Sequence, residues 1–97
     1  MSKGITRYGD NSSGHDACSS VPWQGGLAST VFINGKTCGI IGTFGANHGC
    51  TSHPSHSPVI INGSSTVFAI GKAIARIGDS CNCGDKVNIV SGNVFAN

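Results

Sequence analysis

Short apolar runs are separated by glycine-containing segments along the whole chain, and none of them has the spacing of a helix. The runs at 31–33, 67–70 and 94–96 are rich in β-branched and aromatic residues, which favours strands. The 15 glycines are spread over the 97 residues, and no i, i+3, i+4, i+7 pattern persists for three turns. We therefore expect an all-β fold of short strands, with loops at 21–23 and 52–58.

The strand segments belong to an internal repeat. Residues 29–36 (STVFINGK) and 65–72 (STVFAIGK) are identical at six of eight positions, at an offset of 36 residues. A third copy at 92–97 stops after its strand, and the missing half is matched at the N-terminus, where 5–10 (ITRYGD) resembles 74–79 (IARIGD). The middle copy, 38–43, keeps the glycine but lacks the Arg and the Asp. Such a permuted repeat predicts that the first and last strands pair, and that three repeats close about a pseudo-threefold axis.

Composition indicates a small protein with a modest core. With 97 residues, of which 38% are hydrophobic and 10% charged, we expect one domain over residues 1–97. The net charge of +2 and the scattered Lys and Arg residues argue against a nucleic-acid partner. No apolar run approaches the ~20 residues of a membrane span, so stable membrane insertion is not expected. Residues 1–10 lack the apolar region of a signal peptide, so we expect synthesis and assembly in the cytoplasm.

The five cysteines are informative because of the expected compartment. A reducing cytoplasm favours free thiols or metal ligands over disulfides, with Cys18 and Cys50 as a possible bridge. Cys81 and Cys83 are too close in sequence for both thiols to bind one zinc easily. We expect Cys81 to be a small packed residue.

Each repeat places one candidate metal ligand in the loop after its Gly-Asp position, or after the equivalent of that position. These ligands follow that position by four or five residues and are His15, His48 and Cys83. The insertion after His48 adds a fourth ligand, for which we choose His56 and keep His53 in reserve. Three His and one Cys suit a tetrahedral zinc site. We expect one structural zinc, with iron as the alternative metal; otherwise the histidines are solvated surface residues.

These motifs resemble the PAAR-repeat family. The family motif, Asn-Gly-x-Pro-Ala-Ala-Arg-x-Gly-Asp, is similar to residues 70–79 (IGKAIARIGD), which depart from it at the Asn, the Pro and the first Ala. Further similarities are GHDAC at 14–18, HGCTSHPSH at 48–56, GSSTVF at 63–68 and CG at 83–84. The resemblance extends from Arg7 to Phe95. Within the family, the sequence is most similar to the stand-alone spike tips of T-even-like bacteriophage tails. The tips of type VI secretion systems are near relatives.

The resemblance implies a fold and a role. The fold would be a small cone with pseudo-threefold symmetry, one zinc near the apex and no effector extension. The role would be structural: to cap and sharpen the trimeric β-helical, membrane-puncturing spike of a contractile injection machine, with one copy per trimer. Contact with the target cell envelope would be transient, and self-association is not expected. After synthesis in the bacterial host cytoplasm, the protein would lie at the tip of the tail baseplate spike of the virion, or on a type VI spike.

The broad base of such a cone would seat on the spike. Apolar residues of the repeat strands are expected to divide there between the core and the spike-facing surface: Val31, Phe32, Val67, Phe68, Val94 and Phe95.

Two other functions are compatible with the ligand set. A zinc hydrolase would leave one metal position for water and use Asp16 or Asp79 as base. It is disfavoured because the chain has only four acidic residues, and because the Gly-Asp positions are more simply explained as turns in which Asp accepts backbone or Arg hydrogen bonds. The remaining alternative is a free zinc-binding adaptor domain.

Overall fold

The computed structural model describes residues 2–50 and 53–97, and within these ranges the protein is all-β. No helix in the described ranges is long and apolar enough to cross a membrane. The strands are short because glycine-containing turns end them. They are β1 (Lys3–Gly4), β2 (Trp23–Gly25), β3 (Ala28–Ile33), β4 (Lys36–Cys38), β5 (Phe44–Gly45), β6 (His48–Cys50), β7 (His53–His56), β8 (Phe68–Ala69), β9 (Lys72–Ala73) and β10 (Phe95–Ala96).

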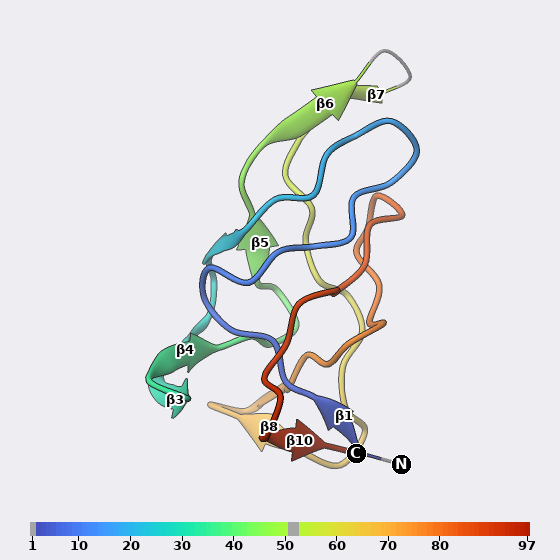
Figure 1. The fold of residues 1–97 in the computed structure, drawn as a ribbon. Helices are drawn as coiled ribbons and strands as arrows, with labels where there is room; N and C mark the ends of the chain where they lie inside the picture. The colour runs from blue at the N-terminus through green and yellow to red at the C-terminus, as the bar shows by residue number, and fades with distance from the viewer. Residues whose placement is uncertain (1, 51–52) are drawn as a thin grey trace.

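These strands form two-stranded antiparallel sheets, in the pairs β1–β10, β2–β5, β3–β4, β6–β7 and β8–β9. The β1–β10 pair joins the two ends of the chain, with Lys3 opposite Ala96 and Gly4 opposite Phe95. This confirms the pairing of first and last strands that the permuted repeat predicts. The molecule is elongated, 37 × 25 × 22 Å. β6 and β7 lie at one end and β1, β3, β4, β8 and β10 at the other (Figure 1).

Three turns with the same hydrogen bonding recur along the chain, at 7–10, 40–43 and 76–79. In each, the backbone N–H of the fourth residue donates to the carbonyl of the first, at 3.0 Å. The third residue is a glycine in the left-handed region, with φ of 83°, 97° and 86° in chain order. The side chain of the fourth residue in turn accepts from the first N–H, through Asp10 (3.0 Å), Thr43 (3.0 Å) and Asp79 (2.7 Å).

The Arg residues of the first and third turns bind the same carboxylates. Arg7 Nε donates to Asp10 Oδ2 at 2.8 Å, and Arg76 Nη2 donates to Asp79 Oδ1 at 3.0 Å. These contacts confirm that the Gly-Asp positions are hydrogen-bonded turns. Thr43 can replace the Asp in the middle copy because its side-chain hydroxyl accepts the equivalent hydrogen bond from a backbone N–H.

Two clusters of buried side chains fill the interior. The first includes residues of β3, β4, β8 and β10 and comprises Ile5, Ala28, Ile33, Cys38, Ile40, Ala69, Ile74 and Ala96. The second comprises Trp23, Ile60, Ala75, Cys81 and Val87. Cys81 is 4% exposed, which confirms that it is a packed residue.

The predicted loops at 21–23 and 52–58 are wrong in part. Trp23 begins β2, and residues 53–56 form β7; Ser52 lies outside the described residues. Backbone pairing with β5 and β6 makes these segments strands, although their sequences lack the apolar alternation by which strands are recognised. The expectation that cysteines outside the metal site are free thiols is also wrong for one pair, because Cys18 and Cys50 form a disulfide.

Candidate metal centre

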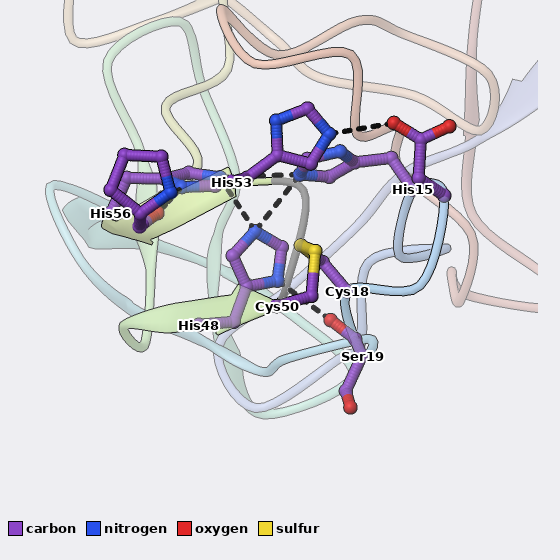
Figure 2. The surroundings of a disulfide bond; sticks show 9 residues. His15, Cys18, Ser19, His48, Cys50, His53 and His56 are labelled. Carbon is purple, nitrogen blue, oxygen red and sulfur yellow. Dashed lines mark hydrogen bonds and ion pairs between the residues drawn. A yellow bond between two sulfur atoms is a disulfide. The ribbon is translucent and has the colours of Figure 1, made fainter.

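Three histidine rings meet at the β6–β7 end of the molecule. His48 begins β6, and His56 ends β7 directly opposite it in the antiparallel register. His15 begins a tight turn in which the N–H groups of His15 and Cys18 donate to each other's carbonyls, at 3.1 and 2.8 Å. Figure 2 shows the three rings turned toward one another.

The Nε2 atoms of these rings form a small triangle. His15 Nε2 lies 3.2 Å from both His48 Nε2 and His56 Nε2, and the latter two are 2.9 Å apart. In a tetrahedral zinc site with Zn–N distances near 2.0–2.1 Å, two nitrogens lie about 3.3 Å apart. The triangle is therefore close to one face of such a tetrahedron.

Hydrogen bonds at Nδ1 indicate which nitrogen is protonated in two of the rings. His48 Nδ1 lies 2.7 Å from the carbonyl oxygen of Ser19, and His56 Nδ1 lies 2.7 Å from that of Pro54. A carbonyl only accepts, so each Nδ1 is the protonated nitrogen, and in the neutral ring each Nε2 has a lone pair. Two lone pairs facing each other at 2.9 Å repel. A cation bound by both removes that repulsion, and carbonyl partners of this kind are typical of metal-binding histidines.

The thiol of Cys83 completes the group. The ligand atoms of His15, His48, His56 and Cys83 all lie within 4.8 Å of one another, and Cys83 is a partly buried free thiol. Three imidazoles and a thiolate match the ligand preference of zinc. These side chains therefore fit a metal ion. The structure brings together the three ligands expected from the repeat and His56, the residue chosen from the insertion.

His53 lies at the edge of this group. Its Nε2 donates to Asp16 Oδ2 at 2.7 Å, and its ring lies 4.9 Å from that of His15, centroid to centroid. The hydrogen bond and the charge of His53 lower the pKa of Asp16 below its ordinary value. With His15, the two form a second, more exposed group of metal-binding residue types.

Cys81 lies in an environment that disfavours its thiolate form. Burial, with smaller contributions from the charges of Asp85 and Cys83, raises the pKa of Cys81 from 9.0 to about 12. A thiol with so high a pKa is a poor ligand, because the thiolate is the form that binds metal. Cys83, and not Cys81, belongs to the group whose ligand atoms converge with those of the three histidines.

Two features of this site were not firmly predicted from the sequence. The Cys18–Cys50 disulfide links the turn of His15 to the strand of His48, and was given only as a possibility. Asp85 is fully buried between the loops of His15 and Cys83, and was not considered. Asp85 is a charged residue in a segment without a regular apolar pattern, so the sequence did not indicate that it is buried.

The fold and the ligand group define a small β protein with a group of side chains at one end that could hold a metal ion. The PAAR motif family model matches residues 2–88 of the 97, and the chain belongs to this family. No curated protein matches the chain. Membership of the family points to a spike-tip protein of a contractile injection system and accounts for the turns at 7–10 and 76–79.

Proposed function

We propose that this protein caps and sharpens a trimeric β-helical spike of a contractile injection machine, with one copy bound to three spike chains. The observation that supports this most is a set of exposed phenylalanines at equivalent repeat positions. They lie on β3, β8 and β10, at the end opposite the histidines (Figure 1). The three are Phe32, Phe68 and Phe95, with exposed fractions of 60%, 58% and 54%.

The residue before each phenylalanine has the opposite environment. Val31, Val67 and Val94 pack against the first core cluster. This alternation is that of strands with one face in the core and one face outside. Exposed aromatic side chains at three related positions suit a partner that presents three related surfaces, and a trimer does so.

The proposal includes one structural zinc held by His15, His48, His56 and Cys83. Neither core cluster includes a residue of β6 or of the described β7, and a metal with all positions filled by protein can fix the loops at that end. Mechanical puncture of a cell envelope needs a rigid point and no turnover. A hydrolytic role is not proposed, because Asp79 is bound to Arg76 and Asp16 to His53.

The stoichiometry of the complex tests the capping role. Full-length protein is mixed with a purified trimeric spike, and native mass spectrometry counts the chains. We expect one copy per three spike chains; three copies per trimer, or no complex, would refute the cap and favour a free zinc-binding adaptor. Phe68→Ser should weaken binding at least tenfold. Ile77→Ser removes an apolar side chain that is 41% exposed on the turn at 76–79, outside the phenylalanine set, and should bind normally.

A further inference from the structure

Asp85 occupies a position where the other two repeats have apolar residues. The equivalence follows from one backbone hydrogen bond that recurs in each repeat, in which an N–H donates to the carbonyl of the position concerned. The three bonds are Ser12 to Val21 (2.8 Å), Gly45 to Pro58 (2.9 Å) and Cys81 to Asp85 (2.8 Å).

All three positions are buried. Val21 is 7% exposed, Asp85 is 0% exposed, and Pro58 is among the fully buried side chains. Two apolar residues show that packing at this position needs no charge. A carboxylate removed from water is unfavourable unless hydrogen bonds or a nearby charge compensate. Asp85 therefore has a role that Val21 and Pro58 do not.

Its hydrogen bonds identify that role. Asp85 Oδ1 accepts from the backbone N–H of Gly14 at 2.7 Å, from the hydroxyl of Ser13 at 3.1 Å and from its own neighbour, Lys86 N–H, at 2.8 Å. Gly14 directly precedes His15, and Asp85 follows Cys83 by two residues. One carboxylate thus ties together the loops of two ligands that are 68 residues apart (83 minus 15).

The second oxygen is unusual. Oδ2 is buried and has no hydrogen-bond partner among residues 2–50 and 53–97. Packing and Oδ1 alone leave this oxygen uncompensated. A cation bound by His15 and Cys83, on the two loops that Asp85 joins, would help to compensate it, since three neutral imidazoles and one thiolate leave a divalent metal with one net positive charge.

We propose that Asp85 is a positioning residue of the metal centre, which sets the His15 loop against the Cys83 loop and balances the charge of the bound ion. This inference rests on the proposed ligand set. It predicts that Asp85 matters more to the metal-loaded protein than to the metal-free protein. A residue that only held the fold together would affect both forms equally.

The test compares zinc affinity with stability in Asp85 variants of the full chain. Zinc affinity is measured by competition with a chromophoric chelator, and the unfolding temperature is measured with and without zinc. Outer-sphere partners of metal ligands typically change affinity 10- to 100-fold. We expect a drop of about tenfold for Asp85→Asn, which keeps an acceptor oxygen, and of about 100-fold for Asp85→Val, which copies the first repeat. The metal-free forms should unfold within a few degrees of the metal-free wild type.

Asp79→Asn is the matched control, because it makes the same chemical change at a buried carboxylate that binds Arg76 instead of a ligand loop. It should lower the unfolding temperature of both forms equally and change zinc affinity less than twofold. If an Asp85 variant does not fold, Ser13→Ala removes the exposed hydroxyl that donates to Oδ1, together with its contacts to the Gly14 carbonyl and the Lys86 N–H, and should lower affinity by a few fold.

Cobalt(II) provides a second readout, since the intensity of its visible bands reports tetrahedral coordination. Weaker or shifted bands in Asp85→Asn, against wild-type bands in Asp79→Asn, support positioning. Wild-type zinc affinity in both Asp85 variants would overturn the inference and leave the ligand set intact. A wild-type protein that binds no zinc would overturn the ligand set, and the inference with it.

Discussion

His48 Nε2 lies 2.9 Å from His56 Nε2, and in the neutral rings neither of these nitrogens carries a proton, because each ring donates from Nδ1 to a backbone carbonyl. Close lone pairs of this kind are unfavourable in the metal-free protein. The β6–β7 pairing and the bonds to Ser19 and Pro54 hold them in place. Folding thus prepares a site that a metal ion stabilises, and metal binding should increase the free energy of unfolding.

Separate substitutions of the two histidines of β7 distinguish the expected metal ligand, His56, from its neighbour, His53. His56→Ala removes one of the three converging nitrogens and should abolish stoichiometric zinc, with a loss of several kcal/mol in unfolding free energy. His53→Ala removes an exposed bond to Asp16 and a ring contact with His15; exposed pairs of this kind contribute little to stability, so the variant should retain about one zinc per chain. Elemental analysis and urea denaturation measure both effects. The reverse ranking would make His53 the fourth ligand.

The sequence could predict most of this site because the ligands follow the repeat. His15, His48 and Cys83 come after equivalent turns, and the repeat register alone brought them together. The choice between His53 and His56 was different, because both lie in an insertion that has no counterpart in the other copies. The β6–β7 register places His56, and not His53, opposite His48, and no periodic pattern in the sequence indicated that pairing.

Two other features depended on contacts between distant segments. Phe32 and Val31 are both apolar, so composition gave no sign of which faces the core; the strand alternation in three dimensions decides it. Nothing in the sequence indicated that the carboxylate of Asp85 would be buried. Its burial results from its bonds to Ser13 and Gly14, more than 70 residues earlier in the chain.

The disulfide should contribute strongly to stability. Cys18 and Cys50 are separated by 32 residues, and closing a loop of this length stabilises the folded state by about 3 to 4 kcal/mol in the chain-entropy model. The Cys18→Ser/Cys50→Ser double variant should lose about that much in urea denaturation at saturating zinc. Cys18→Ser alone should lose a similar amount, because either change removes the bridge. Equal stability of the wild type and the double variant would contradict this, and alkylation with mass spectrometry would then count the free thiols.

Cys38 should make stability fall at alkaline pH. It is fully buried in the first core cluster, and burial raises the pKa of its thiol from 9.0 to about 11. Below pH 9 the thiol is protonated in both the folded and the unfolded chain, so its contribution to stability is constant. Between pH 9 and pH 11 the unfolded chain releases this proton and the folded protein retains it, which favours unfolding.

Comparison with Cys38→Ala isolates this effect from the other groups that titrate in the same range. The variant should be less stable at pH 7, because a buried sulfur is lost. The difference between wild type and variant should then shrink as the pH rises from 9 to 11. Urea denaturation at four or five pH values measures it, and a difference independent of pH would contradict the raised pKa.

Ile70 should be replaceable by a residue that makes the protein more stable. The β3–β4 and β8–β9 hairpins have equivalent turns, Asn34–Gly35 and Ile70–Gly71, with positive φ at both residues: 55° and 79° in the first, 46° and 80° in the second. Asparagine followed by glycine is the preferred pair for such a turn. A β-branched residue in the left-handed region is strained by about 1 to 2 kcal/mol.

Ile70→Asn should therefore raise the free energy of unfolding by about 1 kcal/mol, measured by urea denaturation. Ile70→Ala is the control, since it also removes an apolar side chain that is 55% exposed but does not favour the left-handed region as asparagine does. A larger gain with alanine than with asparagine would attribute the effect to the side chain and not to the backbone.

Strain retained at an exposed position suggests a use, and the turn of Ile70 follows Phe68 at the end proposed to seat on the spike (Figure 1). The same Ile70→Asn variant should consequently bind a trimeric spike several fold more weakly, so that stability and binding change in opposite directions; unchanged binding would leave Ile70 outside the interface.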